Sequence, residues 1–88
     1  MQTLILYSKP GCHLCEGLQE KLAQIQAIAF DLEVRDITTR ADWMQAYEYE
    51  VPVLVYRGAD ATEIPIPRPS PRLTVAQLER FLQAHLTE

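Results

Sequence analysis

The chain has 88 residues, of which 48% are hydrophobic and 23% are charged, and its formal net charge is −4. This composition is typical of a folded globular chain and argues against a long disordered segment, and we expect a single domain over residues 1–88. The acidic balance argues against nucleic acid and anionic membranes as partners, because both favour a basic face.

The first ten residues, MQTLILYSKP, lack the basic start and the apolar length of a signal peptide. No apolar run approaches the roughly 20 residues that a membrane-spanning helix needs. We therefore expect a cytoplasmic protein. In that reducing compartment a cysteine pair is more often catalytic or metal-binding than structural.

Strand and helix patterns alternate along the first half of the chain. Residues 3–7 form a short apolar run, which is typical of a buried strand. From His13 to Ala29, apolar residues recur at helical spacing, which predicts an amphipathic helix of about four turns. Alternation over residues 31–37 then predicts a second strand.

The next segment reads as a helix followed by a third strand. Thr39 and Asp42 have the spacing of a capping box, which predicts a helix over residues 40–47. Trp43 and Tyr47 are four apart and are expected to pack as one stripe against the sheet. A β-branched run predicts a strand that starts at Val53.

The last third of the chain supplies a hairpin and a closing helix. RGAD predicts a tight turn into a strand over residues 61–66, and Pro65 confines that strand to a sheet edge. The stiff stretch PRPSPR follows, and then a helix that Thr74 caps. The order β-α-β-α-β-β-α predicts an α/β fold in which a mixed four-stranded sheet is flanked by three helices. Helical connections should give parallel strands, and the tight turn an antiparallel hairpin.

Both cysteines lie in SKPGCHLC, Cys12 where the first strand ends and Cys15 one turn later. This spacing brings the two sulfurs to one helix face, where they can form a disulfide. The helix N-terminus favours a thiolate at Cys12, and Lys9 adds positive charge. We predict that the thiol pKa of Cys12 lies below its ordinary value of about 8.5 and that Cys12 is the nucleophile. Cys15, deeper in the helix, would then attack the mixed disulfide formed at Cys12.

Other interpretations of the cysteine segment stay open. His13 either tunes the pair or is an exposed surface residue. A structural zinc site normally needs four ligands, and His85 is the only Cys or His outside this segment, so no metal site within one chain is expected. A metal or iron–sulfur cluster shared between chains remains an alternative.

A second candidate segment is EVPVL. The proline forces Val51 toward an extended backbone. If Pro52 lies near the cysteines, Val51 would offer a free N–H and C=O to an extended substrate. The alternative is a proline that only begins a strand.

These segments together resemble the thioredoxin fold and, within it, the small glutaredoxin-like proteins that carry CxxC. The resemblance covers nearly the whole chain: the first strand, YSKPGCHLC, the helix after it, VPVLV, the hairpin and the closing helix. It implies that Cys12 is the nucleophile and Cys15 the resolving thiol. It also implies that Lys9 helps to activate the thiolate, that Pro52 is the family's cis-proline and that Val51 pairs with substrate.

The chain departs from dithiol glutaredoxins at three places. His13-Leu14 replaces their Pro-Tyr, Glu50 replaces a threonine, and PIPRPSPR replaces the Gly-Gly turn and acidic pair that hold the γ-glutamyl end of glutathione. The resemblance implies a thiol–disulfide oxidoreductase that acts on a protein disulfide or a glutathione mixed disulfide. We expect a monomer with no tightly bound cofactor and with glutathione as candidate co-substrate. The alternative is a binding or scaffold module that holds a peptide or a metal with little turnover.

Overall fold

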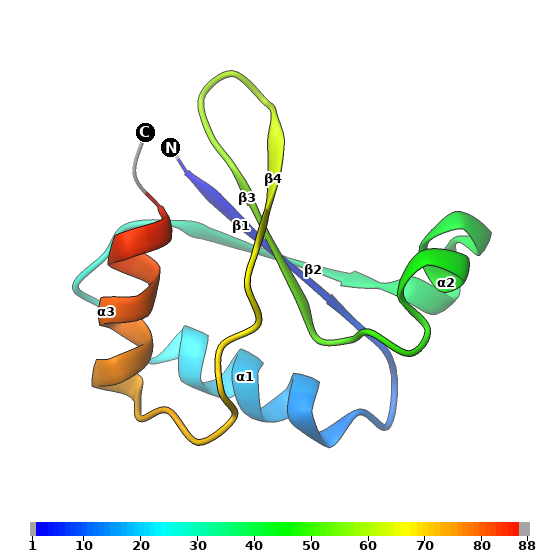
Figure 1. Ribbon diagram of the computed structural model, residues 1–88, viewed down its shortest axis with the longest axis horizontal. Coiled ribbons are helices and arrows are strands. Elements are labelled where there is room, and N and C mark those ends of the chain that lie inside the picture. Colours follow the sequence, from blue (N-terminus) through cyan, green and yellow to red (C-terminus); the bar gives the residue numbers. More distant parts are fainter. Residues whose placement is uncertain (1, 87–88) are drawn as a thin grey trace.

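The computed structural model describes residues 2–86, and its strands form one sheet in the order β2-β1-β3-β4. Along the chain the elements are β1 (Thr3–Ser8), α1 (His13–Ala23), β2 (Asp31–Asp36), the 3₁₀ turn η1 (Ile37–Thr39), α2 (Ala41–Tyr47), β3 (Val53–Arg57), β4 (Glu63–Ile66) and α3 (Val75–His85). Figure 1 shows α1 and α3 on one side of the sheet and α2 at one end of it. The predicted α/β fold, a mixed four-stranded sheet flanked by three helices, is confirmed.

Strand β1 is central and has neighbours of both senses. It pairs in parallel with β2, Leu4 opposite Leu32, and antiparallel with β3, Leu4 opposite Tyr56. Strand β4 pairs antiparallel with β3 and is an edge strand, as its Pro65 predicted. The expectation that every helical connection joins parallel strands is wrong at α2, because β3 runs antiparallel to β1. Helix α2 turns the chain at the end of the sheet instead of crossing a face (Figure 1).

One face of the sheet is buried by α1 and α3. Leu4 and Leu6 of β1 are fully buried there, in one apolar cluster with Leu22 of α1 and Leu82 of α3. Helix α3 begins as predicted: the Thr74 hydroxyl accepts the backbone N–H of Gln77, and the Gln77 side chain accepts the backbone N–H of Thr74.

The opposite face is buried in part by aromatic side chains. Trp43 and Tyr47 of α2 pack against the buried Ile5, Tyr7 and Val55, so the predicted aromatic stripe is confirmed. The Tyr7 ring meets the Trp43 ring edge-on with centroids 5.6 Å apart, and its centroid lies 4.5 Å from that of Tyr47. Burial raises the pKa of Tyr47 above its ordinary value.

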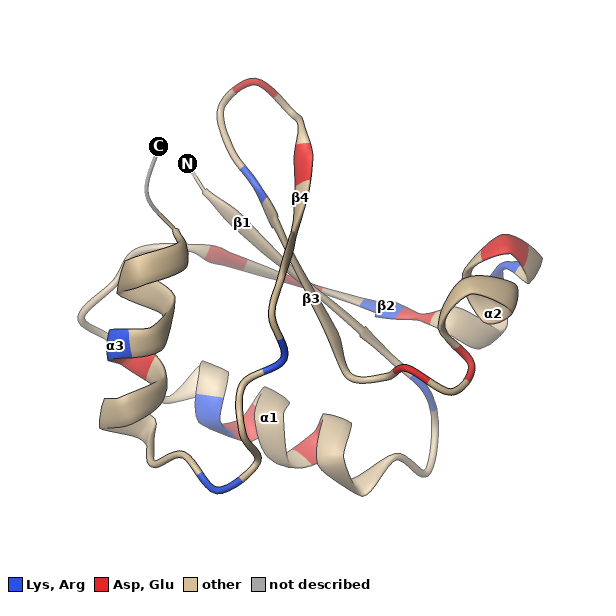
Figure 2. Cartoon of the chain, viewed as in Figure 1, with Lys and Arg blue, Asp and Glu red and all other residues tan. Residues whose placement is uncertain are grey.

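Four charged residues on the rest of that face form ion pairs with one another, and we call them the charged cluster: Glu33, Arg35, Arg57 and Glu63. They come from three different strands, where Figure 2 shows acidic and basic positions side by side. Arg35 donates to Glu33 at 2.5 Å and to Glu63 at 3.2 Å, and Arg57 donates to Glu33 at 3.2 Å. Arg35 also donates to the Tyr7 hydroxyl at 2.6 Å. The hydrogen bond from Arg35 holds the pKa of Glu33 below its ordinary value.

The predicted end of the first helix is wrong. Helix α1 ends at Ala23, although Ile25 is buried and Ile28 also packs on the core beyond it. A helix continuing to residue 29 would span about 25 Å, longer than the roughly 20 Å of a six-residue strand such as β1. The chain instead returns to start β2, where the Asp31 N–H donates to the Gln2 carbonyl at 2.9 Å.

Helix α2 has the predicted range to within one residue, but the predicted capping box of Thr39 and Asp42 is wrong. Its N-cap is Arg40, with no side-chain capping bond, and the Thr39 hydroxyl donates to the Asp36 carbonyl at 2.7 Å. Asp42 instead accepts from the Arg40 guanidinium at 2.9 Å, which lowers the pKa of Asp42.

Within residues 2–86, no helix combines the length and the apolar character needed to cross a membrane.

Candidate functional site

The cysteine segment leaves β1 through a tight turn. The Cys12 N–H donates to the Lys9 carbonyl at 3.3 Å, with Pro10 and Gly11 at the two central positions. Gly11 has φ +80°, the value that a type II turn requires at its second central residue and that glycine adopts without strain. The sequence Lys-Pro-Gly-Cys therefore places Cys12 at the start of α1.

Cys12 is the N-cap of α1. Its backbone is extended, and its sulfur accepts the backbone N–H of Cys15 at 3.2 Å. The two sulfurs form a disulfide, with the Cα atoms 5.3 Å apart. Cys12 is half-buried, whereas Cys15 is only 2% exposed. The predicted proximity of the two sulfurs and the deeper position of Cys15 are both found.

Lys9 links the cysteine turn to the segment before Pro52. Its Nζ donates to the Glu48 carbonyl at 3.1 Å, across a sequence separation of 39 residues, and the side chain is partly buried. The ammonium group therefore holds the end of α2 against the turn that carries Cys12.

The Val51–Pro52 peptide bond is cis, and Pro52 is buried. Pro52 lines the same cavity as His13 and Leu14, the two residues between the cysteines, so the fold brings the two candidate segments together. The expected free N–H of Val51 is not found, because it donates to the Tyr47 carbonyl at 3.2 Å. An incoming strand would have to displace that bond or use the Val51 carbonyl alone.

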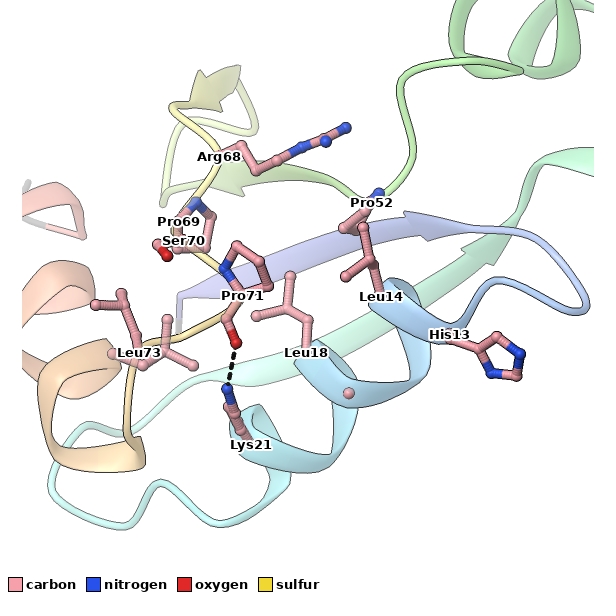
Figure 3. A pocket seen from close by; sticks show the side chains of 12 residues that line it. His13, Leu14, Leu18, Lys21, Pro52, Arg68, Pro69, Ser70, Pro71 and Leu73 are labelled. Carbon is pink, nitrogen blue, oxygen red and sulfur yellow. Dashed lines mark hydrogen bonds between the residues drawn. The ribbon is translucent and has the colours of Figure 1, made fainter.

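A cavity of about 180 Å³ lies between α1 and residues 67–73, which we call the proline loop, and it reaches His13 and Leu14, the two residues between the cysteines. Figure 3 shows Leu14 and Leu18 facing Pro52 and Pro71 across it, with Leu73 farther along the wall. Leu14 and Leu18 come from α1 positions four apart, on one face of the helix. The prolines of this loop predicted a stiff segment, but they did not predict that it forms one side of a cavity.

Two cations that the sequence reasoning did not single out fasten the proline loop. Lys21 Nζ donates to the Pro71 carbonyl at 2.8 Å, and the Arg68 guanidinium donates to the Glu50 carbonyl. Lys21 and Arg68 also line the cavity. The basic residues that flank the prolines in PRPSPR were the available sequence signal for this arrangement.

His13 is an exposed residue at the start of α1. Its side chain is 95% exposed, and Figure 3 shows the ring directed away from the cavity. Nδ1 lies 3.4 Å from the Glu16 carboxylate. Among residues 2–86 no group of three or more His, Cys, Asp or Glu side chains is placed to hold a metal ion.

Comparison with known proteins identifies the family. Residues 3–83 match the family model described as Glutaredoxin-like domain (DUF836). The chain is 34% identical to a solved structural-genomics target protein, XcR50 from X. campestris, over 92% of this chain and 96% of that one, with a TM-score of 0.59.

A structure described as a malarial protein shares the fold, with 11% identity, a TM-score of 0.66 and 99% coverage of both chains. No curated protein matches the chain significantly. The family match and the cysteine pair at disulfide distance together indicate a redox-type function. The chain belongs to the glutaredoxin-like family and has a thioredoxin-like fold.

Proposed function

We propose that this protein is a thiol–disulfide oxidoreductase in which Cys12 is the nucleophile and Cys15 the resolving thiol. The observation that carries the proposal is the position of the Cys12 sulfur, which caps α1 and accepts the Cys15 N–H. In the reduced protein the same N–H and the positive end of the helix would stabilise a thiolate at Cys12. Cys15 is buried and therefore less accessible to an external disulfide.

The reaction proceeds in two exchange steps. The Cys12 thiolate attacks one sulfur of a substrate disulfide, forms a mixed disulfide and releases the other sulfur as a thiolate. Cys15, after losing its proton, attacks the Cys12 sulfur and releases the second substrate thiol. The protein gains the Cys12–Cys15 disulfide, and the substrate gains two electrons and two protons. An external thiol reductant then restores the dithiol.

The remaining predicted site residues have supporting roles in this proposal. Lys9 adds positive charge beside the cysteine turn and, through Glu48, fixes the chain that leads to Pro52. Pro52 forms the wall opposite the residues between the cysteines. Val51 would contribute its carbonyl to a bound substrate, because its N–H is already engaged by Tyr47.

A single-turnover reaction tests the assignment. The protein is reduced, freed of reductant and mixed with one equivalent of a glutathionylated peptide, and the products are followed by mass spectrometry. Wild type should release the peptide thiol and glutathione and form the Cys12–Cys15 disulfide. Cys15→Ser should stop at a mixed disulfide on Cys12. Cys12→Ser should react no faster than a variant in which both cysteines are serine.

Two outcomes would contradict the proposal. A mixed disulfide that accumulates in Cys12→Ser and not in Cys15→Ser would reverse the two roles. A wild-type rate equal to that of the double-serine variant would leave a binding module as the better account. Repeating the wild-type reaction under turnover conditions, with glutathione or with dithiothreitol as reductant, then shows which class of thiol regenerates the protein.

A further inference from the structure

The cavity that reaches the residues between the cysteines combines an apolar wall with a basic rim. We infer that it selects polypeptide disulfides in which a large apolar residue neighbours the reacting cysteine and an acidic residue follows it. This inference rests on the proposed function, because it concerns what Cys12 reacts with. It names a protein substrate class and places glutathione outside it.

The apolar part of the inference starts from Leu14. This residue lies between the two cysteines, yet its side chain is 52% exposed. Together with Leu18, Pro52 and Pro71 it faces the cavity (Figure 3). Exposed apolar surface beside a reactive sulfur becomes favourable when a substrate side chain covers it. A leucine or phenylalanine next to the substrate cysteine would do so.

The charged part follows from which ionisable groups line the cavity. They are Lys21 and Arg68, since the His13 ring points away from the cavity, and among residues 2–86 no carboxylate lines it, although the whole chain has a net charge of −4. A carboxylate on the substrate would meet Lys21 or Arg68 at the rim. The α-ammonium group of a γ-glutamyl residue would find no acidic partner there, and a charge desolvated without a partner is costly.

The cavity wall is also held in place before any substrate arrives. Lys21 donates to the Pro71 carbonyl and Arg68 donates to the Glu50 carbonyl, so the loop wall is fastened at two points, to α1 and to the turn after α2. Pro69, between them, is buried. A wall of this kind loses little conformational freedom when a side chain enters, which favours binding.

The test compares symmetric disulfides of short peptides, so that either sulfur gives the same product. In each peptide one neighbour of the cysteine, on its N-terminal or its C-terminal side, is leucine or serine. A glutamate or a lysine then follows in the sequence. Each rate with reduced wild-type protein is divided by the rate of the same peptide with dithiothreitol, which removes intrinsic differences in reactivity. Glutathione disulfide is measured in the same way.

We expect the best leucine peptide to react at least about tenfold faster than its serine counterpart, since apolar pockets discriminate by about that factor or more. Glutamate should be preferred to lysine by a few-fold at low salt, and that preference should shrink in 1 M salt. Glutathione disulfide should react more slowly than the leucine–glutamate peptide.

Variants with matched controls locate the selectivity. Leu14→Ser should reduce the leucine preference, whereas Ile64→Ser, at a side chain that is 51% exposed on β4, should retain it. Arg68→Gln should reduce the glutamate preference, and Arg80→Gln, at an exposed position of α3, should not.

The outcomes separate this inference from the proposed function. Equal normalised rates for leucine and serine peptides, or a faster reaction with glutathione disulfide, would overturn the inference while thiol exchange stands. No reaction of any disulfide above the double-serine background would overturn the proposed function itself. Leucine selectivity that survives in Leu14→Ser would place the apolar contact elsewhere and overturn the assignment to this cavity.

Discussion

The two faces of the sheet bury the same central strand in different ways. Leu4 lies beneath α1 and α3, and its chain neighbour Ile5 lies on the face that carries α2 and the charged cluster; both are fully buried. On the first face apolar side chains of two helices exclude water. On the second, long charged side chains from β2, β3 and β4 supplement a single short helix, with their aliphatic parts available to cover apolar neighbours.

The difference shows how a chain of 88 residues can cover both faces of a sheet with few helices. It also places the residues of the proposed chemistry and the charged cluster on different faces of the sheet. The face with α1 and α3 leads to the cysteines, because α1 begins at the Cys12 cap, and the cavity lies along the same helix. The charged cluster is built from strand residues that do not line the cavity.

The largest expected effects come from equivalent truncations on the two faces. Leu4→Ala should lower the free energy of unfolding by about 3–5 kcal/mol, within the range for buried leucines. Ile5→Ala should cost less, about 2–3 kcal/mol, because flexible charged side chains and water can fill the space more readily than two packed helices can. Urea unfolding followed by circular dichroism measures both.

An equal loss of unfolding free energy in Ile5→Ala and Leu4→Ala would contradict the proposed difference between the faces. The charged face would then be packed as rigidly as the helical one. Unchanged denaturant slopes are needed for the two values to be compared.

A smaller effect is expected at Arg35, the centre of the charged cluster. Its side chain is only 16% exposed and donates to Glu33, Glu63 and the Tyr7 hydroxyl. Arg35→Met keeps the aliphatic stem and removes these bonds, and should cost about 1–3 kcal/mol. Thiol exchange by Cys12 should be unchanged. Arg40→Met, which breaks an exposed ion pair with Asp42, is the control and should have no measurable effect on unfolding.

A loss of thiol exchange in Arg35→Met, with the fold intact, would contradict the separation of the two faces. A loss of stability in Arg40→Met as large as that in Arg35→Met would show that the stabilisation by the charged cluster does not depend on its burial.

Hydrophobic periodicity and turn-forming residues were sufficient to predict most of the fold. The apolar run of β1, the Thr74 cap and the edge position of Pro65 are local signals, and the structure confirms each. The end of α1 was predicted too late because Ile25 and Ile28 keep apolar spacing beyond the helix. Those residues pack on the core from a loop, which periodicity alone does not distinguish from a helix.

The site was predictable where its residues are neighbours in sequence and less so where they are not. Cys12 and Cys15 share one turn, so their approach followed from helical spacing. The engagement of the Val51 N–H by Tyr47 and the cavity wall formed by the proline loop depend on contacts that only the folded chain creates. Arg68 and Lys21 were missed for the same reason, because their partners lie 18 and 50 residues away in the sequence.

The smallest expected effect is the pH dependence of the charged cluster. The hydrogen bond from Arg35 lowers the pKa of Glu33 from its ordinary value of 4.5. A carboxyl group with a lower pKa in the folded state stabilises the fold above its unfolded pKa, and that contribution is lost as pH falls through the folded pKa. The difference in unfolding free energy between wild type and Glu33→Gln should therefore be constant near pH 7 and shrink below about pH 4.5.

Because the Glu33 side chain is 38% exposed, solvent screens it and the change should be small. Urea unfolding at a series of pH values, at low and at high salt, measures the change. The same series on Arg35→Met should show a flatter profile, since the group that lowers the Glu33 pKa is gone. An equally steep profile in that variant would assign the acid sensitivity to Asp36 or Asp42 instead, whose pKa values are lowered by hydrogen bonds from Thr38 and Arg40. Acid stability would then depend on caps and exposed pairs at the α2 end of the sheet, and the charged cluster would act through packing alone.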